Sequence, residues 1–241
     1  RFPLVGTLVC FHAHPDDESI ATGGTIARAV AEGHRVVLVM ATGGEYGETP
    51  ADLAEGETLR DRRRAETERS AAVLGVHRVA WLGYHDSGMT GWEQNSLPGS
   101  FIGADVEEAA NRLAEILRTE HADVLTAYDW HGNYGHPDHI QVHRVGMRAA
   151  EMAGVRVVQA TMNRDAMRIM AQQAKEAGAD EFDPDGPADD GNPMGTPAAD
   201  ITYAVDVTPW VLQKRESIRC HASQITDSGF FSQMPDDVFA F

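Results

Sequence analysis

The sequence predicts an α/β fold in which a mostly parallel, Rossmann-like sheet carries helices on both faces. Over the first two-thirds of the 241 residues, short apolar runs alternate with longer amphipathic stretches, as strands and helices do in such folds. Two of the amphipathic stretches are followed closely by glycine (Gly75 and Gly154), the residue favoured just after a helix. The length suits one α/β domain and is short for two full domains.

The predicted elements of the core follow one another as strand and helix in turn. The apolar runs are predicted as strands, at residues 4–11, 35–41, 78–82, 123–127 and 156–160. The amphipathic stretches between them are predicted as helices, at residues 20–32, 59–74, 106–120 and 139–152. We expect a single domain over residues 1–241, with its core at 1–162.

The rest of the chain is predicted as long loops and a small extension. Residues 90–103 are rich in Gly, Pro, Asn and Ser, and residues 180–200 are rich in Asp, Gly and Pro with no basic residue. Loops of this length in a compact domain usually have a function or move. The C-terminal extension, residues 163–241, is predicted to add a strand at 201–207 and a helix after Pro209.

Composition and charge indicate which kinds of binding partner the protein is not expected to have. The formal net charge is −17 at pH 7, and an acidic surface repels phosphate backbones and anionic lipid, so we expect no nucleic-acid and no membrane partner. No apolar stretch is long enough to span a bilayer, and the first residues do not read as a signal peptide. Cys10 and Cys220 lie far apart and make a poor disulfide framework, which favours a reducing, cytoplasmic location. The sequence leaves open whether the protein is a monomer or a homo-oligomer.

Two clusters of His and Asp follow the first and fourth predicted strands. The first reads His-Ala-His-Pro-Asp-Asp-Glu at residues 12–18, and the second contains His-Gly-Asn-Tyr-Gly-His-Pro-Asp-His at residues 131–139. Because ligands of open parallel sheets bind beyond the carboxyl ends of the strands, both clusters are expected on the same rim. Two such clusters converging on one rim predict a metal site.

The residue types suit zinc. His14, Asp17 and His139 would supply two imidazole nitrogens and one carboxylate oxygen, which leaves a position for water. Zinc lowers the pKa of a bound water to about 7, so that it can attack an amide carbonyl. Iron(II) is kept as an alternative metal.

Hydrolysis also needs acid–base groups beside the metal. Asp16 adjoins a predicted ligand without having to bind the metal, and is the expected general base. His136 is the natural candidate to support the oxyanion and protonate the departing amine. Asp138 is expected to orient His136 through its other ring nitrogen.

Each assignment has a simpler competitor. Asp16 and Asp17 would also serve as caps at a helix start, where the helix dipole favours negative charge. The His-Pro-Asp-His segment would also serve as a turn with a satisfied histidine. His12 is expected to be a packed residue, and His143 a structural histidine with a fourth-ligand role left open. The metal prediction depends on both clusters occurring at equivalent strand ends.

These two motifs resemble the PIG-L/LmbE family of zinc-dependent N-deacetylases, which includes a mycothiol-pathway deacetylase and mycothiol S-conjugate amidase. The match lies at residues 13–18 and 136–139, and the resemblance extends over most of the chain. The resemblance implies the same metal ligands as the chemical argument, with Asp16 again as the general base. It also implies that His136 supports the oxyanion and the leaving group. It further implies that Tyr134, two residues before His136, helps to stabilise the transition state.

Weaker motifs resemble the substrate side of the family's site. Gly44 and Glu45 follow the second predicted strand, where the family has a glycine loop beside the substrate. Arg63 lies in an Arg-x-x-Glu motif and would hold sugar hydroxyls, although a solvated helix face also explains it. Asp86 follows the third strand and resembles the residue that contacts sugar hydroxyls in the mycothiol branch. His221 begins a motif whose histidine is in reach of the site in relatives.

The sequence therefore predicts a metal-dependent amide hydrolase that removes an N-acetyl group from a small amino-sugar substrate such as an N-acetylglucosaminyl-inositol-like molecule. Alternatives are an amidase on mycothiol S-conjugates, a natural-product sugar deacetylase, and a non-catalytic sugar-binding or structural zinc protein. Asp16 and His136 argue against a non-catalytic zinc protein, because a protein that only binds a metal does not need them. A nucleotide-binding oxidoreductase would need a glycine fingerprint after the first strand, where this chain has His-Pro-Asp-Asp.

Overall fold

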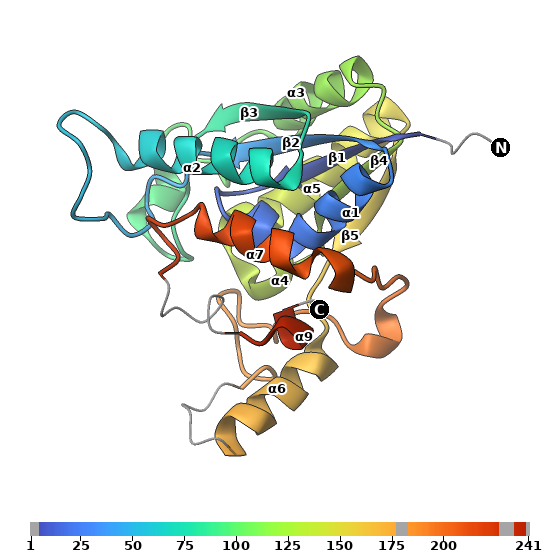
Figure 1. Ribbon diagram of the computed structural model, residues 1–241. Coiled ribbons are helices and arrows are strands. Elements are labelled where there is room, and N and C mark those ends of the chain that lie inside the picture. Colours follow the sequence, from blue (N-terminus) through green and yellow to red (C-terminus); the bar gives the residue numbers. More distant parts are fainter. Residues whose placement is uncertain (1–4, 177–182, 227–233, 240–241) are drawn as a thin grey trace.

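A five-stranded sheet forms the centre of the computed structural model, which describes residues 5–176, 183–226 and 234–239. The strand order is β3-β2-β1-β4-β5, and neighbouring strands pair in parallel (Figure 1). The strands are β1 (Thr7–His12), β2 (Arg35–Thr42), β3 (Arg78–Tyr84), β4 (Val124–Tyr128) and β5 (Arg156–Ala160). The predicted α/β fold is confirmed.

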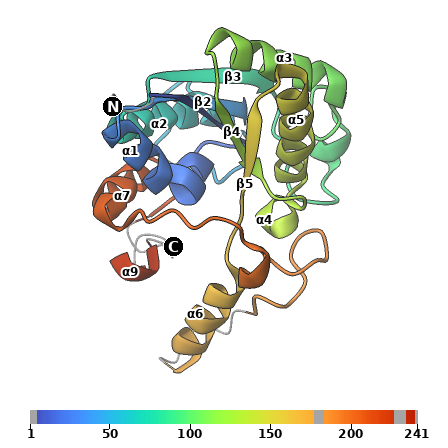
Figure 2. The same cartoon turned by 90° about the vertical axis from the view of Figure 1, so that its right-hand side faces the viewer.

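Helices cover both faces of the sheet (Figure 2). On one face lie α3 (Val106–Thr119) and α5 (Pro137–Ala153); on the other lie α1 (Gly23–Ala31) and α2 (Leu59–Leu74), against which α7 (Val211–Arg219) packs. Side chains alternate between the faces of a strand, so Val9 and Phe11 join the α3–α5 core while Cys10 joins the α1–α2 core. Because both faces are covered, the central strands are mostly apolar.

The remaining described elements are short or peripheral. They are η1 (Glu18–Thr22), η2 (Glu93–Ser96), α4 (Gly132–Gly135), α6 (Arg164–Glu176), η3 (Ala198–Asp200), η4 (Thr208–Trp210) and α9 (Asp236–Phe239). No described residue of α6 is buried, and this helix projects from the body of the molecule (Figures 1 and 2). Within the described ranges, no helix is long and apolar enough to cross a membrane.

The extension differs from its prediction. Residues 201–207, all of them described, form no strand, because this mostly exposed segment pairs with no neighbouring strand. The predicted helix after Pro209 exists as α7, whereas α6 was not predicted. The predicted 180–200 loop lies partly outside the described residues.

Strand order places the two His/Asp clusters together. β1 lies between β2 and β4, so the chain leaves β1 toward one side of the sheet and β4 toward the other. The crevice beyond such a switch point is where ligands of open α/β sheets bind. The loops that follow β1 and β4 carry the clusters into this crevice.

Gly75, the residue that follows α2, lies close to Val30 of α1, and its substitution tests this packing contact. It ends α2 with a φ of 80°, and an added Cβ would lie 2.8 Å from Val30 Cγ1. Gly33 has a similar φ of 88° with open space around it. We expect Gly33→Ala to lower the free energy of unfolding by about 1–2 kcal/mol, the cost of the left-handed backbone alone. Gly75→Ala should cost about 1–3 kcal/mol more because of the clash. Urea unfolding measures both, and equal losses would contradict the packing described.

Candidate metal and catalytic site

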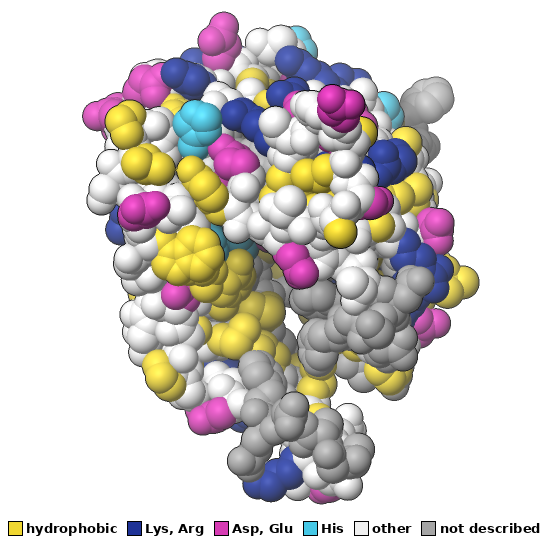
Figure 3. Space-filling model, turned by 90° about the vertical axis from the view of Figure 1, so that its left-hand side faces the viewer, with side chains coloured by type: hydrophobic (Ala, Val, Ile, Leu, Met, Phe, Trp, Pro, Cys, Tyr) yellow, Lys and Arg dark blue, Asp and Glu magenta, His cyan; other side chains and the backbone are white. Residues whose placement is uncertain are grey.

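Three histidines from two loops form a buried cluster at the carboxyl ends of β1 and β4. The ring centroids of His14 and His136 lie 4.7 Å apart, those of His136 and His139 5.2 Å, and those of His14 and His139 5.4 Å. All three side chains are buried. Figure 3 views this end of the sheet, where the surface is hollowed and a histidine side chain is visible inside the hollow. The structure thus brings together the two clusters that the sequence placed on one rim.

Asp17 lies at distances from the two predicted ligand histidines that suit a shared ion. Asp17 Oδ2 lies 3.5 Å from His14 Nδ1 and 3.3 Å from His139 Nε2. Ligands held at about 2.1 Å in a tetrahedron are separated from one another by about 3.4 Å. Two imidazoles and a carboxylate are a donor set that zinc and ferrous iron both accept.

Other groups of side chains in the same region could also hold an ion. Among the described residues, candidate ligand atoms within 4.8 Å of one another come from His14, His136 and His139, and from His14, Asp86 and Asp138. The second group uses the opposite edge of His14, since its Nε2 lies 3.1 Å from Asp138 Oδ2 and 3.4 Å from Asp86 Oδ1. His14 therefore stands between two possible positions for a metal.

The Asp138 carboxylate contacts His14, a partner that the sequence did not indicate. Its carboxylate accepts from His14 Nε2 and from the Ser87 backbone N–H and hydroxyl. A carboxylate on the far nitrogen of a ligating histidine fixes ring orientation and increases its basicity. The carboxylate thus faces His14 and Ser87, and among the described contacts it makes none with His136. Ser87 had no assigned role in the sequence, although it stands next to Asp86 at the end of β3.

The backbone of Asp138 orients His136 instead. The Asp138 N–H donates to His136 Nδ1 at 3.1 Å, which makes His136 the N-cap of α5. A ring nitrogen that accepts cannot carry the proton, so a neutral His136 carries it on Nε2. Burial lowers the pKa of His136 to about 2, with His14 and His139 adding to the shift. The ring is therefore held as a neutral donor.

The charges of His14 and Asp17 are set by each other and by their neighbours. Burial alone would lower the pKa of His14, but the carboxylates of Asp86, Asp138 and Asp17 outweigh it and raise that pKa well above its ordinary value. Burial alone would raise the pKa of Asp17, but His139 and His14 hold it well below its ordinary value. A cation between them would take over the charge pairing that the imidazole protons provide.

Asp16 lies beside this cluster in a strained backbone conformation. Its φ is 97°, its N–H donates to Glu18 Oε2 at 3.0 Å, and its Oδ2 accepts from Arg63 Nη2 at 3.2 Å. Burial raises the pKa of Asp16 to about 6, against the opposing effect of Arg63. Left-handed backbone at a residue other than glycine costs about 1–3 kcal/mol and is concentrated at functional sites. Asp16 and Asp17 both lie outside the two groups of close ligand atoms described above, so what distinguishes them is that Asp17 contacts His14 and His139 whereas Asp16 pairs with Arg63.

Aromatic side chains enclose His139. Tyr128, at the end of β4, stacks on its ring with centroids 4.5 Å apart, a contact that the sequence did not indicate. The Tyr134 hydroxyl lies 3.4 Å from His139 Nε2, so this predicted residue does reach the cluster. The Tyr134 carbonyl accepts from the Asp189 N–H at 3.0 Å, so the acidic C-terminal loop holds the Tyr134 segment.

The predicted substrate contacts are largely engaged within the protein. Arg63 is buried and donates to the carbonyls of Gly44 and Pro15 as well as to Asp16. Gly44 has a φ of 64°, and a Cβ there would lie 2.4 Å from Arg63 Nη1. Arg63 therefore joins the loops that follow β1 and β2.

Asp86 and Glu45 differ in how many of their carboxylate oxygens are free to accept a hydrogen bond from a substrate. Asp86 accepts from the N–H groups of Gly88 and Tyr46 and also faces His14. Glu45 Oε1 pairs with His85 Nδ1 at 2.7 Å, whereas its Oε2 is buried without a partner among the described residues. Of the predicted substrate contacts, Glu45 has the clearest unused acceptor.

The other predicted histidines have structural contacts. His12 bonds to the Tyr128 hydroxyl at 2.7 Å and to Thr22 Oγ1 at 2.8 Å, as expected of a packed residue. His143 Nδ1 bonds to the Tyr128 carbonyl. His221 bonds to Glu18, one residue beyond the candidate ligand Asp17.

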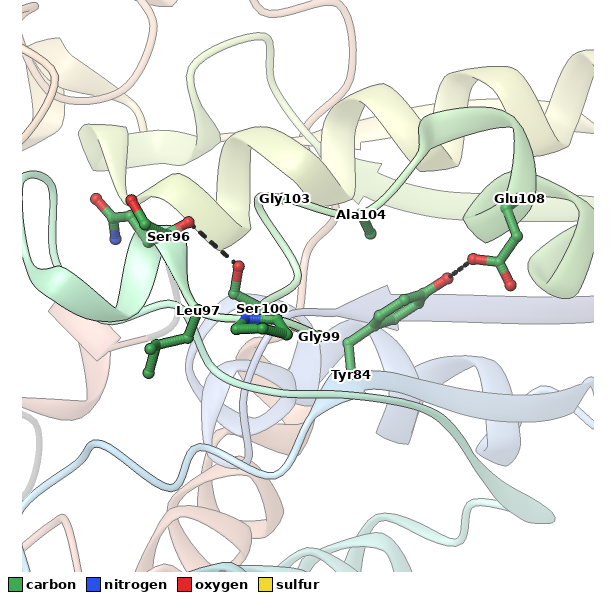
Figure 4. Close-up of a pocket in the computed structure, with 10 residues that line it drawn as sticks. Tyr84, Ser96, Leu97, Gly99, Ser100, Gly103, Ala104 and Glu108 are labelled. Carbon is green, nitrogen blue, oxygen red and sulfur yellow. Dashed lines mark hydrogen bonds between the residues drawn. The ribbon is translucent and has the colours of Figure 1, made fainter.

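A separate pocket of about 380 Å³ lies beside β3 and the start of α3 (Figure 4). In it the Tyr84 hydroxyl donates to Glu108 at 2.5 Å. None of its lining residues belongs to the His/Asp clusters, so it is distinct from the candidate site.

Comparison with known proteins gives consistent matches. Residues 9–150 match the family described as PIG-L: GlcNAc-PI de-N-acetylase. A 1D-myo-inositol 2-acetamido-2-deoxy-alpha-D-glucopyranoside deacetylase of Nocardiopsis dassonvillei is 42% identical, over 94% of this chain and 87% of the relative. The deacetylase of the same name from Thermobifida fusca is 40% identical, over 92% of this chain and 84% of the relative.

A solved structure agrees with them. The N,N'-diacetylchitobiose deacetylase from Pyrococcus horikoshii superposes with a TM-score of 0.60 at 27% identity, covering 99% of this chain and 74% of that one. The matched residues 9–150 include every residue of the His/Asp clusters.

Proposed function

The chain belongs to the PIG-L family of de-N-acetylases, and on that premise we propose that it removes the acetyl group from an N-acetylglucosaminyl-inositol-like molecule. The reaction class is hydrolysis of the amide bond between an acetyl group and the nitrogen of an amino sugar. The observation that carries the proposal is the spacing of Asp17 Oδ2 from both His14 Nδ1 and His139 Nε2, with the Asp16 carboxylate nearby and paired with Arg63.

We assign the metal to the Nδ1 edge of His14, with Asp17 and His139 as its other ligands, and propose zinc as its identity. When bound, such a cation polarises the amide carbonyl and lowers the pKa of water. The Nε2 edge of His14 is then held by Asp138, as in the carboxylate–histidine pairs of other metal sites.

The side chains divide the proton transfers between them. Asp16 accepts a proton from the attacking water, a role that suits a carboxylate whose pKa burial raises to about 6. His136 donates from Nε2 toward the oxygen that becomes negative, and the Tyr134 hydroxyl is placed to assist. As the carbon–nitrogen bond breaks, the proton taken by Asp16 passes to the amine, and acetate and a free amino sugar leave. The sequence suggested His136 as the donor to the amine, but burial lowers its pKa to about 2, so the neutral ring keeps its Nε2 proton and serves the oxyanion alone.

The conjugate amidase is the second candidate, since it needs the same machinery and a wider pocket. The named relatives favour deacetylation, because both are deacetylases of an acetamido sugar linked to inositol. A silent metal-binding protein is disfavoured by Asp16, whose strained backbone would serve nothing there.

Release of primary amine from a panel of N-acetylated sugars tests the proposal. N-acetylglucosaminyl-inositol should be the best substrate, with kcat/KM at least about tenfold above a mycothiol S-conjugate, a difference of about 1.4 kcal/mol in transition-state binding. A chelator should stop the release, and added zinc should restore it. Preference for the conjugate would favour the amidase. If protein with bound metal released no amine, both the deacetylase and the conjugate amidase proposals would be wrong.

A further inference from the structure

The turn after α7, residues 221–224, holds three segments of the rim and is called here the C-terminal clasp. His221 Nε2 donates to Glu18 Oε1 at 2.6 Å. Ser223 donates to the Glu66 carboxylate from both its N–H and its hydroxyl. Gln224 exchanges two hydrogen bonds with the backbone of Glu48. The clasp lies outside the residues 9–150 that match the family.

One of these contacts leads directly to Asp16. Glu18 and His221 are both completely buried, and their pair is isolated from solvent. Glu18 Oε1 also accepts from the hydroxyls of Ser19 and Ser70, whereas Oε2 accepts from the Asp16 N–H at 3.0 Å. The carboxylate therefore joins the clasp on one oxygen to the backbone of Asp16 on the other.

That backbone needs support. Asp16 has a φ of 97°, and such a conformation persists only where surrounding contacts over-determine it. Its N–H has Glu18 as acceptor, and its carboxylate has Arg63 as donor. Arg63 fixes the side chain, and Glu18 fixes the peptide that aims it.

We propose that Glu18 and His221 are positioning residues for Asp16, with His221 holding the Glu18 carboxylate where it accepts the Asp16 N–H. The effect on turnover rests on the proposed function; the effect on the Asp16 backbone does not. Loss of His221 leaves a buried carboxylate with one strong donor fewer, so Glu18 turns to find other partners and releases the Asp16 peptide.

Ser223 offers a matched control. It ties the same clasp to α2 through Glu66 and makes no contact with Glu18 or Asp16 among those described. Ser223→Ala should loosen the clasp without releasing Asp16. His221→Leu removes the donor to Glu18, while His221→Gln keeps an N–H at a similar reach and should recover most of the loss.

The experiment measures two quantities on each zinc-loaded variant. Hydrogen exchange of the Asp16 amide by NMR should become about tenfold faster in His221→Leu and stay unchanged in Ser223→Ala. With N-acetylglucosaminyl-inositol, kcat should fall about 10- to 100-fold in His221→Leu, as for a misplaced catalytic group, with KM and zinc content unchanged.

The outcomes separate the two claims. Unchanged Asp16 exchange in His221→Leu, or an equal fall of kcat in Ser223→Ala, would overturn the positioning role. Faster exchange in His221→Leu from a wild-type protein that shows no deacetylation would support the positioning role and count against the proposed function alone. If His221→Leu does not fold, His221→Gln should still show intermediate exchange, and wild-type exchange in it together with reduced kcat would also overturn the role.

Discussion

Asp16→Asn should lower kcat by about 10²- to 10⁴-fold while the metal stays bound, which is the usual contribution of a general base. The amide has the size of the carboxylate and still offers an oxygen to Arg63, but it cannot take a proton. The Asp16 carboxylate pairs with Arg63 and is not among the proposed ligands, so metal content should equal that of the wild type. Steady-state kinetics with metal analysis of the same samples measures both.

The control for this change is Asp206→Asn. Asp206 is exposed and caps the turn at Thr208, so its substitution should leave kcat within error. If Asp16→Asn kept wild-type turnover, the base would have to be another group. If it lost its metal, Asp16 would be a ligand, and the division of roles between Asp16 and Asp17 would be wrong.

Removal of a metal ligand should have the second large effect. In the proposed placement, His139→Ala takes away one of three ligands, and metal affinity should fall by more than the 10- to 100-fold typical of losing an outer partner. Turnover should fall with it at limiting metal. Competition with a chromogenic chelator measures the affinity without any need for activity.

Asp138→Asn is the matched variant, because it decides which edge of His14 binds the ion. If the metal lies at Nδ1, Asp138 is an outer partner, and its substitution should cost about 10- to 100-fold in affinity, less than His139→Ala. If the metal lies at Nε2 between Asp86 and Asp138, the order of the two effects reverses. The reversed order would refute the proposed ligand set.

The sequence correctly predicted that both His/Asp clusters lie on the same rim of the sheet. That conclusion needs only the alternation of strands and helices along the chain. Residues 12–18 and 129–139 follow apolar runs, and the carboxyl ends of parallel strands share one edge whatever the details of packing. The bounds of α2 and β5 were also predicted correctly, since a capped helix and a short apolar run are local patterns. The strand at 201–207 failed because strand formation needs a partner, which local sequence does not supply.

The partners of single side chains could not be predicted in the same way. Asp138 is two residues from His136, and proximity in sequence suggested a contact that its side chain does not make. The bond between Glu18 and His221 joins residues 203 positions apart. The motif at residue 221 suggested that this histidine reaches the site, but nothing in the sequence indicated Glu18 as its partner. Tyr128 lies one residue beyond the predicted strand at 123–127 and was assigned no role, although its ring packs on His139.

The length of chain between Glu18 and His221 also bears on how the protein is made. All proposed metal ligands lie within the first 139 residues, and chains fold from the N-terminal end as they leave the ribosome. Until residue 221 emerges, the Glu18 carboxylate lacks its histidine, and a carboxylate is costly to dehydrate without its partners. The nascent chain should therefore keep water around Glu18 until residue 221 has emerged and folded, so that the peptide of Asp16 gains its final support only after all the proposed metal ligands have been synthesised.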